Sequence, residues 1–477
     1  MATPLGVLQN RFRRSQRQLF IAAAAFSLSC GASSALAQAT GPYLDWGTTV
    51  GPSAPAGSTF TPAPFLYDGN VASVQAYLQS QQSSGGITAV RINTPISAAT
   101  ASAIFDNSSF TVQYVFADLE GPSNLTQTQT LVGQIQGDGS NKSANAFIGN
   151  YSFSTVGSDP TLATARGFSG ANINTFRASG ANMVNPQLYP GAPDYRDPAN
   201  GDTTISGGNF PNLRSSLFIL PIERLSYAAQ SNAAGTPLIP YVSRFMNYGN
   251  GALQNGNGTN GGPVGSFVPG VATQNLTATQ TTNQMLSRDD FQAQMLHYRL
   301  RGATGFHLFD GGVVGYTDTQ FQSDATTGFN FLNSSTYGFA ATTTTPLTFG
   351  SSGNFGGVAN KSSEDAGVIV SGVTNSNSKM AILVSNLTDA GTTYQLPSSI
   401  ANVSVPANEL LTVGPDSHDL FEFSVISGQW HLDLSQIVFD DTGLTAQDET
   451  GVPEPAAVSM LAIGAIGLLR RRSRRVR

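Results

Sequence analysis

Charged residues and cysteine are scarce in this chain of 477 residues. Asp, Glu, Lys and Arg make up 11% of it, against about 25% in an ordinary soluble domain. Cys30 is the only cysteine, so a disulfide framework is excluded and stability must come from the core. No basic patch of the kind that binds phosphates is present, and we predict no nucleic-acid partner. Glycine is abundant, with 51 residues.

Several motifs that mark common enzyme classes are missing as well. No G-x-G-x-x-G stands at a predicted strand-to-helix turn, which gives a dinucleotide fold no support. The phosphate loop G-x-x-x-x-G-K, the hydrolase elbow G-x-S-x-G and the zinc motif H-E-x-x-H do not occur. His297 and His307 do not have the spacing of metal ligands, so we predict no metal and no other cofactor.

The few charges are distributed unevenly along the chain, whose formal net charge is −6. Residues 1–37 carry four arginines and no acid, and residues 453–477 carry six arginines and a single glutamate. The 13 basic and 28 acidic residues that remain give the body between them a net charge of −15. An acidic body between two basic ends indicates that the ends have functions of their own.

Residues 1–37 have the layout of a secretory signal peptide. A start that carries arginines is followed by an apolar stretch over residues 19–28 and by the cleavage site Ala35-Leu36-Ala37. The apolar stretch is too short to span the roughly 30 Å core of a membrane. We therefore predict export across the inner membrane and cleavage by signal peptidase after Ala37.

The most specific motif stands at the other end, where Pro453, Glu454 and Pro455 precede an apolar run over residues 456–469 and an arginine cluster. This order resembles the PEP-CTERM sorting signal of exported bacterial proteins. The resemblance covers residues 453–477. It implies that an exosortase-type membrane protease cuts near the Pro-Glu-Pro motif, whose residues then serve processing rather than catalysis.

The apolar run of 14 residues is shorter than the about 20 that span a bilayer comfortably. Arginines beside a short transmembrane helix can reach the membrane surface, and a basic cluster stays on the cytoplasmic side. We expect a transient anchor that delivers the protein to the cell surface or the extracellular matrix. A permanent C-terminal anchor is the alternative.

Segments with strand and helix patterns alternate between residues 38 and 350. The predicted strands lie near residues 43–46, 87–92, 111–119, 144–153, 182–188, 238–245 and 305–309. The predicted helices lie near residues 70–80, 97–105, 125–135, 213–230 and 287–301. This order predicts an α/β fold. The preferred arrangement is an irregular (β/α)8-like barrel, and a doubly wound open sheet is the alternative. Residues 194–212 and 247–282, rich in Gly and Asn, are predicted to be loops at the carboxyl ends of strands.

The pattern changes near residue 351, where seven short strand-like segments are separated by turn residues. They lie near residues 365–372, 379–386, 391–397, 400–406, 409–414, 421–426 and 429–434. Residues 351–440 are predicted to form a small all-β sandwich, and residues 441–452 a linker to the sorting signal. A barrel followed by a β-sandwich resembles the layout of many secreted glycoside hydrolases. In such a barrel the active site lies at the carboxyl ends of the strands.

Three acids stand at the ends of predicted barrel strands and are the candidate catalytic residues: Asp118, Glu120 and Asp310. Glycoside hydrolysis needs two carboxylates on opposite sides of the bond, one of them acting as an acid. Asp118 or Glu120 paired with Asp310 would supply them. The alternative is that these acids cap helices or bind an ion.

Other residues near strand ends or in loops are candidates for binding a substrate. His307 alternates with its apolar neighbours, so its ring can face the barrel interior. Tyrosines in such loops suit the faces of sugars. The candidate substrate-binding residues are Arg91, Asn93, Tyr189, Tyr241, His307 and Tyr316. Packing in the core is the alternative for the histidine and the tyrosines.

These features predict an exported surface or matrix protein with a glycoside-hydrolase-like barrel that acts on extracellular carbohydrate. The alternative, from another functional class, is a non-catalytic matrix protein that binds polysaccharide. None of the predicted barrel strands ends in the Asn-Glu dipeptide of the best-known barrel glycosidases, which favours the alternative. The acids at the strand ends and the barrel-plus-sandwich layout favour the enzyme.

Overall fold

The structure is a computed structural model. It describes residues 43–45, 61–119, 122–137, 143–153, 173–188, 213–229, 236–243, 286–308, 318–333, 337, 339, 344–347, 366–375, 378–406 and 409–439. Within these ranges no helix has the length and apolar character needed to cross a membrane. The predicted signal peptide, loops at 194–212 and 247–282, linker and sorting signal lie outside the described residues.

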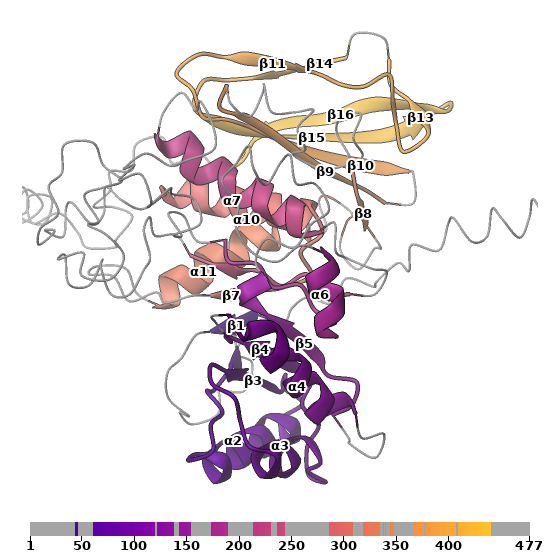
Figure 1. The fold of residues 1–477 in the computed structure, drawn as a ribbon. Helices are drawn as coiled ribbons and strands as arrows, with labels where there is room; N and C mark the ends of the chain where they lie inside the picture. Colours follow the sequence, from indigo (N-terminus) through magenta and orange to yellow (C-terminus); the bar gives the residue numbers. More distant parts are fainter. Residues whose placement is uncertain are drawn as a thin grey trace, which may run out of the picture.

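Strands and helices alternate in the first part of the chain (Figure 1). The strands are β1 (Tyr43–Asp45), β2 (Thr61–Pro62), β3 (Ala89–Ile92), β4 (Tyr114–Ala117), β5 (Phe147–Asn150), β6 (Tyr241–Val242) and β7 (Phe306–Leu308). The helices are α2 (Val71–Ser83), α3 (Ala98–Phe105), α4 (Asn124–Gln136), α6 (Ile173–Ser179), α7 (Leu213–Ala229), α10 (Arg288–Leu300) and α11 (Asp318–Phe329). The predicted mixed α/β character is confirmed.

The strand pairings described in this part are all parallel. β1 pairs with β2 on one side and with β7 on the other, and β7 also pairs with β6. A second run joins β3 to β4 and β4 to β5. Parallel neighbours require a crossover connection, and α3 and α4 supply it between the strands of the second run.

Isolated contacts connect these two runs of strands. Phe65, just after β2, forms a parallel bridge with Arg91 of β3. At the other end, two amides of residues 182–188 donate to the carbonyl of Ile148 on β5 at 3.0 and 3.1 Å. Two parallel bridges then join this segment to residues 238–241 at β6. The contacts therefore lead from β1 through each successive strand to β7, which pairs with β1 again.

Side chains alternate between the inside and the outside of this arrangement, because successive residues of a strand face opposite ways. A cluster of buried side chains fills the inside. Its members are Ala63, Ala89, Phe116, Met183, Ile239 and Tyr241. On β3, Val90 and Ile92 face the other way and pack with α2 and α3. The helices thus cover the outer surface of the strands (Figure 1).

The last part of the chain forms two layers of mainly antiparallel strands, in which β13 and β16 pair in parallel (Figure 1). The larger sheet has the order β12-β13-β16-β15-β10-β9-β8, and β11 pairs with β14 in the smaller one. Their strands are β8 (Thr344–Pro346), β9 (Val368–Asn375), β10 (Lys379–Asn386), β11 (Thr392–Gln395), β12 (Ser399–Ile400), β13 (Val403–Ser404), β14 (Leu410–Val413), β15 (Ser417–Ile426) and β16 (Gln429–Ile437). Strands occur at all seven predicted positions, and β8 adds one ahead of the predicted boundary at residue 351.

A chain of hydrogen bonds crosses from α10 to the larger sheet. His297 Nδ1 lies 2.7 Å from Ser371 Oγ, and its Nε2 lies 2.8 Å from Ser385 Oγ. His418 Nδ1 lies 2.7 Å from the same Ser385 oxygen, and His418 Nε2 lies 3.1 Å from Asp290 Oδ1. All five side chains are buried. Buried polar groups that are satisfied in this way hold the sheet on α10 in one geometry.

Burial lowers the pKa of His297 well below its ordinary value of 6.5, and the charges of Arg301 and His418 lower it further. A histidine that is neutral when folded takes up a proton on unfolding below about pH 6.5. The free energy of unfolding therefore falls as the pH falls from there, by at most about 1.4 kcal/mol per pH unit. Urea unfolding measures this at about pH 7.5 and about pH 5. Between these two values the free energy of unfolding should fall less in His297→Gln than in the wild type.

The matched control for this change is His431→Gln, which removes a half-buried imidazole from β16 outside this chain of hydrogen bonds. We expect His297→Gln to be less stable than the wild type at the higher pH, because Ser371 and Ser385 lose a partner. An equal loss of stability between the two pH values in His297→Gln and in the wild type would contradict the prediction.

Candidate functional site

The carboxyl ends of the parallel strands bring polar side chains to one edge, because parallel strands end on the same side. Asn93 follows β3, Asp118 follows β4, Tyr151 follows β5 and Ser243 follows β6. Asn93 is exposed, whereas Asp118 and Tyr151 are half-buried. Asn93 and Asp118 thus lie at strand ends, where the sequence predicts them. Seven other predicted residues lie outside the described ranges: Glu120, Tyr189, Asp310, Tyr316, Pro453, Glu454 and Pro455.

Aromatic and imidazole rings fill the interior beneath this edge. The ring centroid of His307 lies 4.9 Å from that of Phe116 and 4.5 Å from that of Tyr241. All three side chains are buried. His307 faces the interior, as its alternation with apolar neighbours predicts, and it packs among rings there. Its role in binding a substrate, like that of Tyr241, stays a prediction.

Arg91 is buried in the same interior, with 0% of its surface exposed. Its Nε donates to the carbonyl of Ala63 at 2.7 Å, and its guanidinium carbon lies 3.8 Å from the ring centroid of Phe65. A guanidinium shielded from water requires such hydrogen-bond and π partners. Direct contact of Arg91 with a substrate would require this buried side chain to become accessible.

The electrostatics around Tyr241 place charges of both signs in this interior. Burial raises the pKa of Tyr241 above its usual range, and the negative charge of Asp118 raises it further. The positive charge of Arg91 and the side chain of Asn185 act in the opposite direction. Tyr241 thus stays protonated between a carboxylate and a guanidinium. Among the described residues, no three His, Cys, Asp or Glu side chains gather where a metal ion could bind.

Two further residues belong to this site although the predicted pattern does not single them out. The ring centroid of Tyr151 lies 6.1 Å from that of Tyr241. Tyr151 follows β5 as Asp118 follows β4, so the rule of strand ends identifies it once β5 is known to end at residue 150. Asn185 does not follow the end of a strand. Its segment, residues 182–188, forms only isolated bridges with residues 238–241, so the rule of strand ends does not identify it.

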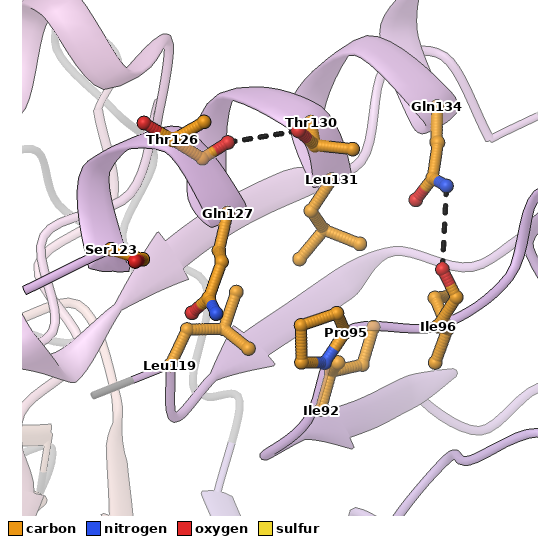
Figure 2. A pocket seen from close by; sticks show the side chains of 10 residues that line it. All are labelled: Ile92, Pro95, Ile96, Leu119, Ser123, Thr126, Gln127, Thr130, Leu131 and Gln134. Carbon is orange, nitrogen blue, oxygen red and sulfur yellow. Dashed lines mark hydrogen bonds between the residues drawn. The ribbon is translucent and has the colours of Figure 1, made fainter. Parts of the chain in front are cut away.

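A groove of about 220 Å³ lies outside this edge, between α4 and the loop after β3 (Figure 2). Ile92 and Leu119 line it, and their chain neighbours are Asn93 and Asp118. The other wall carries hydroxyl and amide groups of α4, among them Gln127 (Figure 2). None of the lining residues is charged, so the groove suits neutral groups.

Comparison with known proteins gives distant likenesses in structure only. No protein-family model and no curated protein matches the chain. A GH27 β-L-arabinopyranosidase from Geobacillus stearothermophilus aligns over 76% of this chain and 63% of its own length, with TM-score 0.32 and 9% identity. α-Galactosidase I from Mortierella vinacea aligns over 75% of this chain and 79% of its own, with TM-score 0.32 and 9% identity. An endo-β-1,6-glucanase aligns over 75% and 63%, with TM-score 0.31 and 10% identity. No activity is carried over from likenesses this distant.

Gly149 allows residues 182–188 to approach the interior closely. A Cβ atom at Gly149 would lie 2.5 Å from Asn185 Oδ1 and 2.8 Å from the carbonyl oxygen of Met183. We expect Gly149→Ala to lower the free energy of unfolding by about 1–3 kcal/mol, because the neighbouring segment has to move. In the control Gly133→Ala, on α4, nothing lies within 4 Å of the added atom, and a gain of about 0.4–1 kcal/mol is expected. Chemical denaturation of both variants measures this, and equal effects would contradict it.

Proposed function

We propose that residues 38–350 form a (β/α)8-type barrel whose carboxyl edge carries a carbohydrate-processing site. The parallel contacts that lead from β1 through every strand back to β1 support the barrel. The position of Asp118 carries the functional part of the proposal. It is a half-buried carboxylate at the end of β4, and its charge acts on the interior residue Tyr241 together with Arg91.

Hydrolysis of a glycosidic bond needs one carboxylate that is negative and a second that gives a proton to the leaving oxygen. In this proposal Asp118 is the negative one, acting as nucleophile or as base, because its charge raises the pKa of Tyr241. Glu120 or Asp310 would supply the acid. Their distance from Asp118 would decide whether the sugar configuration is retained or inverted.

A protein that binds polysaccharide without cleaving it is the alternative function, and the same edge would serve it. Asn93 is exposed there and offers an amide to sugar hydroxyls, while the half-buried ring of Tyr151 offers an apolar face. Such a protein needs these contacts but does not need a negative charge at Asp118. The two functions therefore differ in what the loss of that charge does.

We further propose that the protein is exported and sorted. The support is the order of parts in the sequence: a signal peptide over residues 1–37 and the PEP-CTERM-like segment over residues 453–477. Signal peptidase and an exosortase-type protease would be the processing partners, and an extracellular polysaccharide the ligand. The protein would be held by its C-terminal anchor before it reaches the cell surface or the matrix.

Asp118→Asn keeps the shape of the side chain and removes its charge. If the site hydrolyses glycans, kcat/KM should fall by about a thousandfold or more, because a group that acts on the reacting carbon is lost. Release of reducing sugar from a panel of bacterial exopolysaccharides measures this. The control is Asp106→Asn at the end of α3, where the carboxylate accepts a hydrogen bond from Ser102 at 2.7 Å, away from the edge.

Loss of hydrolysis in Asp118→Asn but not in Asp106→Asn would support the enzyme. Unchanged hydrolysis in Asp118→Asn would remove Asp118 from the mechanism. The binding function would be supported by a different result. The wild type would release no reducing sugar, and polysaccharide in the gel would slow the migration of the wild type and of Asp118→Asn equally in affinity electrophoresis.

Processing at both ends is tested by the intact mass of the protein recovered outside the cell. We expect a chain that starts at Gln38 and ends near Pro453-Glu454-Pro455, without the terminal arginine cluster. The unprocessed chain from lysed cells is the control for the mass assignment. Recovery of an extracellular form that keeps the arginine cluster would contradict the sorting proposal.

A further inference from the structure

The side chain of Asn150 holds the backbone next to Asp118. Asn150 ends β5 and is 1% exposed, and the backbone pairing of β4 with β5 stops where Ala117 faces Asn150. Beyond that point the side-chain amide takes over. Its Oδ1 accepts from the Leu119 amide at 3.3 Å, and its Nδ2 donates to the Leu119 carbonyl at 3.1 Å. A carboxamide carries a donor and an acceptor side by side, so it can replace a peptide group of the ladder.

The remaining hydrogen-bonding positions of this amide are also occupied. Oδ1 accepts from the Ser152 amide at 3.1 Å, and Nδ2 donates to Thr128 Oγ1 on α4 at 2.8 Å. Ser152 Oγ adds a second donor to the carbonyl of Leu119, at 2.5 Å. The orientation of the Asn150 amide is therefore defined, because turning it over would set its NH₂ group against two backbone N–H groups.

β3 holds the same segment from the opposite side, where the amide of Asp118 donates to the carbonyl of Ile92 at 2.7 Å. Leu119 packs outward in the cluster that contains Ile92. Because neighbouring residues of an extended segment face opposite ways, Asp118 faces inward as long as Leu119 stays in place. The direction of the carboxylate thus depends on the backbone of one residue, Leu119, whose N–H and C=O both bind Asn150.

We propose that Asn150 is the positioning residue of the site, which fixes the direction of Asp118 by binding the backbone N–H and C=O of Leu119. The proposal rests on the proposed function in so far as Asp118 acts on a substrate. It goes beyond that function because it assigns control of the reactive geometry to a buried residue of a neighbouring strand. A fully satisfied buried amide holds its partners rigidly, and a partly broken one is costly, so the replacement of a single atom tests the assignment.

Asn182 provides a matched control on the other side of β5. Its Oδ1 accepts from the Ile148 amide at 2.6 Å, and its Nδ2 donates to the Ala146 carbonyl at 3.2 Å. In both asparagines, replacement by Asp keeps the acceptor and turns the donor into an oxygen that faces a carbonyl. Asn150→Asp and Asn182→Asp should therefore both lose stability. Only Asn150→Asp disturbs the peptide next to Asp118.

The test compares the wild-type full chain with Asn150→Asp and Asn182→Asp by NMR, with ¹³C-labelled aspartate. Asp118→Asn identifies the Asp118 carboxyl signal. In Asn150→Asp we expect the titration midpoint of Asp118 to rise by about half a pH unit or more, because a new carboxylate adjoins its backbone. The Leu119 amide should exchange with solvent about tenfold faster or more. In Asn182→Asp both quantities should stay at their wild-type values.

Thr128→Val is the milder variant if Asn150→Asp does not fold, since it removes the acceptor of the 2.8 Å bond from Nδ2 and, within α4, the hydroxyl bond to the Asn124 carbonyl. Because it adds no carboxylate, it should leave the titration midpoint of Asp118 near its wild-type value and speed the exchange of the Leu119 amide by less than Asn150→Asp does. Equal changes in the two asparagine variants, or no change at Asp118 and Leu119 in any of them, would overturn the proposal. These readouts need no substrate, so a wild type that cleaves no glycan would refute the proposed function without deciding whether Asn150 positions Asp118.

Where the wild type cleaves, kcat of Asn150→Asp should fall at least about tenfold with KM within about twofold, and unchanged kcat would overturn the proposal.

Discussion

Parallel pairing between neighbouring strands is the constraint on which the rest of this structure depends. It brings the residues after β3, β4 and β5 to one edge, and the alternation of side chains then sends Asp118 inward and Leu119 outward. The backbone ladder is short, with four paired residues between β4 and β5. The carboxamide of Asn150 extends it beyond Ala117, and that of Asn182 binds the backbone of β5 from the other side. Shape at the edge therefore depends on side chains that carry no charge.

The low charge content of the sequence has a direct counterpart in these contacts. Serine and threonine hydroxyls and asparagine amides make many of the buried links, both at the edge of the strands and between α10 and the antiparallel sheet. Neutral groups of this kind lose less hydration on burial than ions do, and each needs only well-placed partners. Where a cation is buried, as at Arg301, three separate oxygens accept from it.

Local patterns were sufficient to predict the elements that carry their own signals. The helix predicted near residues 287–301 is α10, and Ser287 caps its start by accepting from the amide of Asp290 at 3.0 Å. α11 has a weak apolar pattern, and its Gly328 packs against the backbone of Gln292, a contact that only the folded chain reveals. At the site, the rule of strand ends found Asn93 and Asp118. The burial of Arg91 and the bonds of Asn150 depend on which strands become neighbours, and no short stretch of sequence carries that information.

The hydroxyl of Ser385 lies between two imidazoles, 2.8 Å from Nε2 of His297 and 2.7 Å from Nδ1 of His418. It has one proton to donate, so only one of these nitrogens can receive it. If it donates to His297 Nε2, then His418 must donate to the serine from Nδ1. If it donates to His418 Nδ1, then His297 must donate to the serine from Nε2. The hydrogen-bond direction at one histidine therefore fixes the direction at the other, and the two arrangements differ in the positions of protons but not of heavy atoms.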